Sequence, residues 1–338
     1  MRTAVLRPVV LILAVLCLSG CFNQKVNVIV QPDGSGHILL TETFSRDLVD
    51  MVENSIKQVK MHFSDAGMSQ ENVGKTDPFH NESFLKARAQ CFGPGVTFVK
   101  AQKVDQGGAR GAVTLYSFQD IRQVQIPMAD KSAVMAINAS QMDDPEAAMD
   151  MMMEEEDPSK TVAFTFAPGE INTLTIHMPQ LIADAVEMAK QNQEPASSDE
   201  TATDIIVDES EAEDEENADL GLEMPGAPSP ISGPAPTPGL GSGGANEEEA
   251  IQRMAKELRI QLSVEIKGQV LASTAAYPVP DKAQRFVLYD LEFGKIMTGG
   301  QGREIFSGNG DEEDVLAMFI NQPGAQIETN REIRIDFK

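Results

Sequence analysis

The segment KVNVIVQPDGSGHILLTETF, residues 25–44, decides the fold more than any other stretch of this chain. Residues 25–31 place valine at every second position, which is the two-residue period of a half-buried strand. The Pro-Asp-Gly-Ser-Gly run at residues 32–36 supplies turn residues, and residues 37–44 return as a second strand. The segment therefore predicts a β-hairpin and, with it, antiparallel pairing.

The rest of the first half repeats this pattern of hairpins separated by helices. After Ser45, a suitable cap, apolar residues recur every three or four positions as far as Gly67, which indicates an amphipathic helix. A shorter helix is expected near residues 83–91. Strand pairs are expected at 96–104 with 112–118 and at 161–166 with 171–176, followed by a helix at 179–190.

The second half combines similar elements. Asn246 and Glu249 resemble a capping box for a helix that runs to Leu258. Residues 260–266 alternate as a strand, and a tight turn at Lys267-Gly268 predicts that residues 270–274 pair back on it. The remaining expected elements are a strand at 286–291, a helix at 311–320 and a last strand around 333–337.

This order predicts an α+β fold, with an antiparallel, hairpin-rich sheet of about ten strands and about five packed helices. The expected regions are a leader at 1–20, an N-terminal α+β region at 21–192, a linker at 193–246 and a C-terminal α+β region at 247–338. An acidic, Met-rich insert occupies residues 132–159. The pattern leaves open whether the two α+β regions share one sheet or form two domains.

The net charge of −25 is concentrated in two segments. Eight acidic residues lie between Lys131 and Lys160 and sixteen between Lys190 and Arg253, with no Lys or Arg among them. Dense like charge with Pro and Gly predicts a disordered linker at residues 193–246. The rest of the chain is nearly neutral, which argues against nucleic acid as a partner.

The N-terminus carries an export pattern. Arg2 and Arg7 precede an apolar run at residues 9–18, and Leu18-Ser19-Gly20-Cys21 ends it. This stretch resembles the lipobox of bacterial lipoproteins. The resemblance implies that residues 1–20 are removed and that the Cys21 thiol receives a diacylglycerol, with palmitate as a typical acyl chain. An ordinary secretory signal, or a membrane-spanning anchor, is the alternative, although the apolar run is short for a span.

Cysteine use excludes an intrachain disulfide in the mature chain. Cys17 leaves with the leader and Cys21 is the lipidation candidate, so Cys91 is the one free thiol. No reactive arrangement surrounds Cys91 in the sequence, which favours a buried structural cysteine.

No motif for catalysis, a cofactor or a metal stands out. The four histidines occur singly at positions 37, 62, 80 and 177, without zinc-site spacing, and Gly34-Ser-Gly36 lacks the pattern of a nucleophile elbow. Methionines recur at 128, 135, 142 and 149 and again at 151–153. Thioethers suit soft metals such as Cu(I), but methionine also serves as adaptable apolar filling.

Two further stretches carry a resemblance: residues 95–100 through 115–121, and residues 262–268 through 288–295. They resemble uncharacterised bacterial lipoproteins with an early Asp-Gly-Ser-Gly hairpin and an antiparallel extracytoplasmic region. The anchor followed at once by a hairpin is also similar to LppM-type lipoproteins, whose curved sheet implies contact with lipid or glycolipid. The resemblance brings no catalytic residues.

Together these features predict a lipid-anchored bacterial envelope protein without enzymatic activity, which binds or scaffolds a protein partner or an apolar or lipid ligand. The membrane is the expected partner through the anchor. Phe22 after the cysteine, where an inner-membrane retention signal would have Asp, favours the outer membrane facing the periplasm in a two-membrane cell. The alternatives are an envelope enzyme whose residues are dispersed in sequence, and copper handling through the Met-rich insert.

Overall fold

The structure, a computed structural model, describes residues 22–65, 77–128, 158–191, 257–280, 282–298, 312–320 and 322–338. Residues 1–21, the linker at 193–246 and nearly all of the Met-rich insert at 132–159 lie outside this part of the chain. The expectations for those segments stay predictions.

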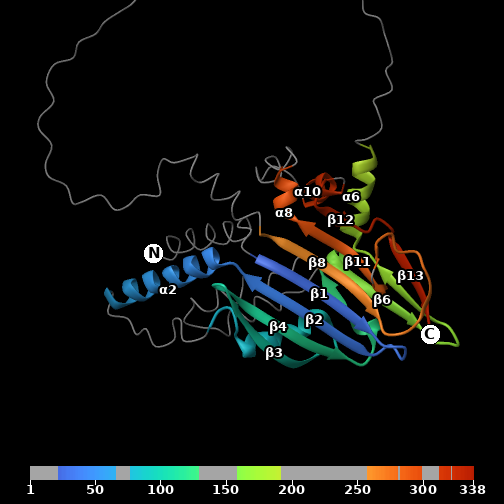
Figure 1. Cartoon of the computed structure of the whole chain (residues 1–338), viewed down its shortest axis with the longest axis horizontal. Helices are drawn as coiled ribbons and strands as arrows, with labels where there is room; N and C mark the ends of the chain where they lie inside the picture. Colours follow the sequence, from blue (N-terminus) through green and yellow to red (C-terminus); the bar gives the residue numbers. More distant parts are fainter. Residues whose placement is uncertain are drawn as a thin grey trace, which may run out of the picture.

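An eight-stranded sheet forms the larger layer (Figure 1). Its strand order is β10-β11-β8-β1-β2-β4-β3, and β12 also pairs with β11. The strands are β1 (Phe22–Val30), β2 (Gly36–Phe44), β3 (Thr97–Gln106), β4 (Ala109–Phe118), β8 (Arg259–Ile266), β10 (Pro278–Val279), β11 (Lys282–Glu292) and β12 (Ala325–Ile327).

The two hairpins expected in this sheet are present. β1 and β2 pair antiparallel over nine residues, from Phe22 opposite Phe44 to Val30 opposite Gly36. β3 and β4 pair around Gly107 and Gly108, whose φ angles of 63° and 88° suit the left-handed backbone of a two-residue hairpin turn. The alternating pattern thus located both strands of each pair.

A five-stranded antiparallel sheet forms the second layer, in the order β5-β6-β7-β13-β9. The strands are β5 (Gln125–Pro127), β6 (Thr161–Ala167), β7 (Asn172–His177), β9 (Val270–Ser273) and β13 (Glu332–Phe337). The described residues thus hold thirteen strands rather than about ten. The very short β5, β10 and β12 are too brief for a periodic pattern to reveal.

The expected hairpin at residues 260–274 is wrong. β9 pairs with β13 in the second sheet, not with β8. Both edges of β8 are already occupied, because it runs parallel to β1 on one side and antiparallel to β11 on the other. Beyond β8, Lys267 N–H donates to the Val30 carbonyl, and Gln269 exchanges two backbone hydrogen bonds with Lys338, at 2.8 and 3.0 Å. The chain therefore crosses between the sheets.

Strands from both sides of the linker build both sheets. In the first sheet, β1 lies between β2 and β8, although β8 follows more than two hundred residues later. In the second, β13 lies between β7 and β9. Fully buried side chains of the two inner faces join in one core, among them Val28, Ile38, Leu262, Leu174, Ile176 and Ile335. The two α+β regions therefore do not form separate sheets: their strands are interleaved in both sheets.

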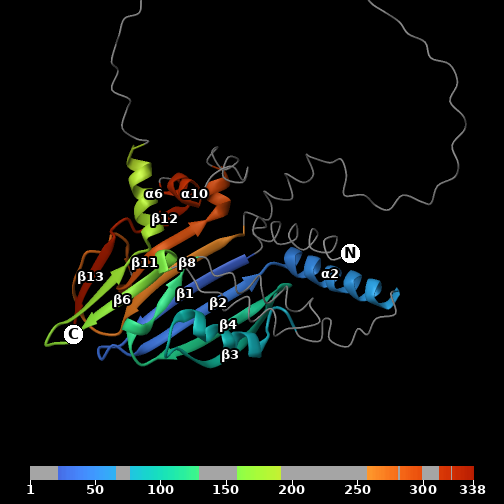
Figure 2. The ribbon, with the colours of Figure 1, turned by 180° about the vertical axis from the view of Figure 1, so that it is seen from behind.

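Five α-helices occur in the described residues: α2 (Arg46–Asp65), α3 (Glu82–Ala87), α6 (Gln180–Gln191), α8 (Phe293–Thr298) and α10 (Glu312–Phe319). Short 3-10 turns are η1 (Arg88–Phe92), η2 (Ile121–Gln123) and η3 (Pro158–Lys160). Figures 1 and 2 show α6, α8 and α10 grouped beside the end of β11, whereas α2 extends away from the sheets. None of the helices described is long and apolar enough to cross a membrane.

Helix expectations were met with two exceptions. The helix predicted from Asn246 to Leu258 begins outside the described residues, and its last two positions, Glu257 and Leu258, are a turn and irregular chain. Helix α8 was not expected. It begins where the Phe293 N–H donates to the Leu258 carbonyl, a contact between distant segments that no local pattern encodes.

Candidate functional site

Cys21, the predicted lipidation site, lies outside the described residues. The residue after it, Phe22, is the first of β1, so this strand begins three residues earlier than its valine pattern indicated. The Phe22 ring packs on that of Phe44, with centroids 5.0 Å apart. The described residues thus place Phe22, the residue after the cysteine, on an inner strand of the larger sheet.

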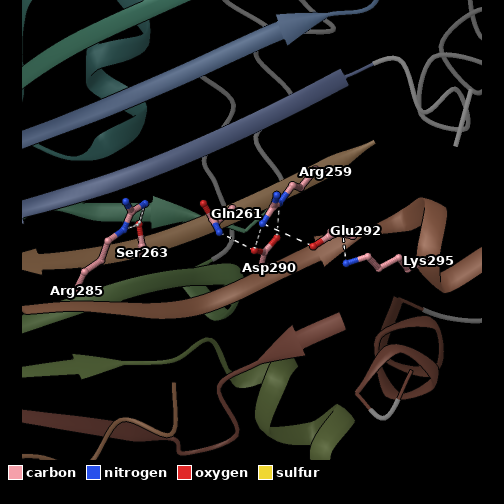
Figure 3. A network of polar contacts seen from close by, with 7 residues as sticks. All are labelled: Arg259, Gln261, Ser263, Arg285, Asp290, Glu292 and Lys295. Atoms are coloured by element: carbon pink, nitrogen blue, oxygen red, sulfur yellow. Dashed lines mark hydrogen bonds and ion pairs between the residues drawn. The ribbon is translucent and has the colours of Figure 1, made fainter. Parts of the chain in front are cut away.

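A polar network covers β8 and β11 on the side of the larger sheet that faces away from the core (Figure 3). Asp290, whose side chain is 10% exposed, is one centre. Its carboxylate accepts hydrogen bonds from Arg259 Nε at 2.8 Å and from Gln261 Nε2 at 2.6 Å. Arg259 also approaches Glu292 at 3.7 Å, and Lys295 pairs with Glu292 at 2.7 Å.

Ser263 is the second centre of this network, and it is fully buried. Its hydroxyl accepts from Arg285 Nε and Nη2, at 3.2 and 2.9 Å, and donates to Asn27 Oδ1 at 2.9 Å. Asn27 in turn donates to Glu265 at 3.2 Å, and Lys267 binds the other oxygen of Glu265. The contact between Asn27 and Ser263 joins β1 to β8 across the parallel pair.

Two ionisable groups of the network, Arg259 and Glu265, have shifted pKa values. The hydrogen bond from Arg259 to Asp290 raises the pKa of Arg259, although partial burial opposes this. The Lys267 hydrogen bond lowers the pKa of Glu265 against burial, and the Asn27 amide adds to the effect. Both groups are charged at neutral pH as a consequence.

Chemically, the network is suited to rigidity. A nucleophilic serine needs a neighbouring base that can take its proton. The Ser263 hydroxyl donates to the Asn27 amide oxygen and, at 3.5 Å, to the Val26 carbonyl, neither of which is a base, and it accepts from the Arg285 guanidinium. The hydrogen bonds of Asp290 come from within the network. The arrangement therefore braces β1, β8 and β11 and offers no activated nucleophile.

A second ionic cluster is buried between η1 and the inward face of β2 in the larger sheet. Arg88, 1% exposed, binds Glu42 through both terminal nitrogens, with Nη2 2.9 Å from Oε1 and Nη1 beside Oε2. Gln24 also donates to Glu42, at 3.2 Å. Glu42 sits on the inward face of β2 between Leu40 and Phe44, where the alternating pattern predicts an apolar residue. No local pattern indicated its partner, Arg88, which comes from η1.

A surface hollow of about 340 Å³ opens at the end of the larger sheet where β1 begins. Asn23, Thr43, Phe44, Ser45, Ala109 and Glu257 line it. Asn23 and Thr43 stand opposite each other on β1 and β2, and Ser45 caps α2 by accepting from Leu48 N–H at 3.5 Å. The size is at the lower end of the range for small-ligand sites. No sequence motif marked this site, because its residues come from four separate segments.

The histidines singled out in the sequence lie on separate elements and form no common site in the described part of the chain. His37 is on β2, His80 precedes α3 and His177 ends β7, where it contacts Thr165 and Glu332. His62 is in α2, and its side chain is outside the described set. No metal-binding group of His, Cys, Asp or Glu forms among the residues that the structure describes.

Two sulfur-bearing side chains, Cys91 and Met128, pack against hydrophobic residues of the fold. Cys91 forms no disulfide among the described residues, is half-buried rather than buried, and packs near Phe84. Met128, the first methionine of the regular series, packs partly buried against the main core, and its N–H donates to the Lys160 carbonyl at 3.0 Å. The methionines from 135 to 153 are outside the described residues.

Comparison with known proteins leaves the family open. No protein-family model matches the chain, and no curated protein matches its sequence. Among solved structures, it is similar to the folded domain of the LppM (Rv2171) protein of Mycobacterium tuberculosis, with 9% identity over 82% of this chain and 85% of that one. The TM-score is 0.24, too low an overlap to support any structural or functional argument.

Proposed function

We propose that this chain is a lipid-anchored, non-enzymatic protein of the bacterial envelope, which binds or scaffolds a partner or an apolar ligand. The observation that carries the proposal is the start of β1 at Phe22, directly after the cysteine of the lipobox-like Leu18-Ser19-Gly20-Cys21. The export signal predicted from the sequence would then lead directly into β1 of the larger sheet.

The anchor would fix the orientation of the sandwich. One extended residue spans about 3.3–3.6 Å, so a lipid on Cys21 would hold the beginning of β1 against the headgroups. The end of β2, the beginning of β4 and the beginning of β8 lie in register with the beginning of β1. The turn at Asp33 and Gly34 lies at the other end of β1, about 30 Å away at 3.3–3.4 Å per residue.

The outward face of the larger sheet supports a binding role. Next to the polar network, its central strands carry Ile29 on β1, Leu39 on β2, and Val113 and Leu115 on β4, all half-buried. The β2–β4 register places Leu39 opposite Leu115. Apolar side chains beside a rigid polar rim are the usual composition of a surface that recognises a partner.

The absence of enzymatic activity is likewise proposed. In its support, Ser263 is braced by Arg285 and Asn27 rather than activated by a base, as described above. An apolar recognition face and a network whose charges pair internally both suit a binding module better than a reacting centre.

Mass spectrometry of the native protein extracted from membranes tests the anchor. The expected N-terminal peptide begins at Cys21 and carries a diacylglycerol, and Cys21→Ala abolishes that mass and releases the protein from the membrane fraction. A mature N-terminus elsewhere, or a membrane-bound Cys21→Ala variant, would contradict the anchor. Native mass spectrometry of the same extract then identifies any lipid or protein that co-purifies.

A further inference from the structure

The hollow at the beginning of β1 is lined in part by polar side chains that have no hydrogen-bond partner among the described residues, unlike those of the polar network beside it. Asn23, Thr43 and Glu257 line it, and none of their side chains has a hydrogen bond or ion pair within the described part of the chain. In the network, by contrast, Ser263 and Asp290 are each held by two or more neighbours. In a concave site, a few polar groups with open hydrogen-bonding positions orient a small polar ligand.

These three side chains follow a row across the end of the sheet. Thr43 on β2 faces Asn23 on β1, and Asn23 in turn stands beside Arg259, the first residue of β8. Glu257 lies two residues before Arg259. The row thus offers a hydroxyl, an amide and a carboxylate in sequence, while Phe44 and Ala109 supply apolar lining.

The charge of the hollow selects its ligand. Glu257 is the one charged residue among those that line it. The nearby guanidinium groups are engaged elsewhere: Arg259 with Asp290, Arg110 with Glu53, and Arg46 with Asp50. A carboxylate that has no ion-pair partner among the described residues and is flanked by neutral hydrogen-bonding groups favours a cation that also carries acceptor oxygens.

We propose that the hollow binds the ammonium-bearing headgroup of a membrane aminophospholipid. Glu257 accepts from the ammonium group, and the Asn23 amide and the Thr43 hydroxyl donate to the headgroup oxygens. This inference rests on the proposed anchor at Cys21, because the anchor brings the beginning of β1, and with it the hollow, to the headgroup layer. A volume of about 340 Å³ admits a headgroup but not a whole lipid.

The test uses the full lipidated protein in phosphatidylcholine vesicles that contain a small fraction of photoactivatable phosphatidylethanolamine with a free amine. Cross-links should map to residues 22–45 or 257–259. Glu257→Gln should lower their yield about fivefold, the scale expected for a partly exposed charged contact. Glu170→Gln is the matched control, because Glu170 is an exposed carboxylate in the turn between β6 and β7, and Figure 1 shows this turn near the C-terminus and far from α2. Its yield should equal that of the wild type.

Three results would overturn the inference: equal yields from wild type and Glu257→Gln, cross-links that map elsewhere, or an equal yield with a phosphatidylglycerol probe. Free O-phosphoethanolamine that binds the protein while the lipid probe does not would also overturn it, since the ligand source would be soluble. Failure of the anchor is read separately, from the mass of the N-terminal peptide. If the native protein carries no lipid and still cross-links in a Glu257-dependent manner, the anchor proposal is contradicted and the headgroup site remains supported.

Discussion

Arg88 holds the carboxylate of Glu42 with both terminal nitrogens inside the sandwich, where neither side chain is more than 6% exposed. The two residues are 46 positions apart. Glu42 lies between Leu40 and Phe44 on the buried face of β2, and Arg88 is flanked by alanines in the chain. The Arg88 guanidinium also lies 5.9 Å from the centre of the Phe92 ring. This pair fixes η1 against the inner face of β2.

Removal of one partner should therefore be costly. Arg88→Met leaves a buried carboxylate without its cation, and we expect a loss of about 3–5 kcal/mol in the free energy of unfolding, measured with chemical denaturant. The double variant Glu42→Gln with Arg88→Met should recover much of that loss. Lys86→Met, which breaks an exposed pair with Glu82, should lower the free energy of unfolding far less. Equal losses for Lys86→Met and Arg88→Met would contradict this account.

Two glycines with positive φ should respond differently to alanine. A Cβ on Gly93, at φ 106°, would stand 2.1 Å from the Gln123 carbonyl oxygen, so backbone must move. A Cβ on Gly107, at φ 63°, meets nothing within 4 Å. Gly107→Ala should cost about 1–2 kcal/mol of unfolding free energy, the left-handed penalty alone. Gly93→Ala should cost distinctly more, and the comparison fails if their thermal midpoints coincide.

Asp77 should contribute to stability in a pH-dependent manner. Burial by itself would raise its pKa, but the Lys103 hydrogen bond, the Phe79 N–H and the Arg110 charge together lower it below the usual 3.8. A carboxyl group with a lowered folded-state pKa stabilises the fold above its unfolded pKa, and this contribution is lost as the pH falls through the folded pKa. Unfolding free energy should therefore decline below about pH 4 by a larger amount in the wild type than in Asp77→Asn. Lys103→Met should shrink the difference.

Asp290 and Glu292 provide a matched pair around Arg259. Asp290 is nearly buried and accepts from Arg259 and Gln261, whereas Glu292 is 31% exposed and stands 3.7 Å from Arg259. Asp290→Ala should cost about 2 kcal/mol in unfolding free energy, because it leaves a partly buried guanidinium and an amide without their acceptor. Glu292→Ala should cost about 1 kcal/mol or less. The reverse order would show that the network does not brace the strands.

The anchor orientation predicts two different depths. Spin labels at Ser35, in the turn between β1 and β2, and at Gln106, at the end of β3 in register with Ala109, are introduced as cysteines into a Cys91→Ser background. Because Phe44 pairs with Arg110, Gln106 lies near the anchored end of the sheet, and Ser35 lies about 30 Å from it. In vesicles, oxygen-induced relaxation should be greater at Gln106. Equal accessibility at both labels would contradict the orientation.

Local pattern was sufficient for much of this fold. Alternating valines and a Gly-rich turn located β1 and β2, and the same logic located β4, β6, β7, β8 and β13, because a strand with one buried face repeats every two residues. It could not tell which strands far apart in the chain pair with one another. Val26 and Val28 fit β8 in a parallel pair as well as they fit β2, and nothing near Lys267 announces that the chain crosses to the second sheet.

The sequence by itself determined the lipobox-like pattern that ends at Cys21, the hairpin at residues 25–44 and the acidic segments, since each depends on neighbouring residues alone. Only the tertiary structure decided that two distant regions interleave, that Arg88 meets Glu42 inside the sandwich, and that Asn23, Thr43 and Glu257 line one hollow. Pairing between strands far apart in the chain depends on which edges remain open once the core has packed, and that is a property of the whole fold.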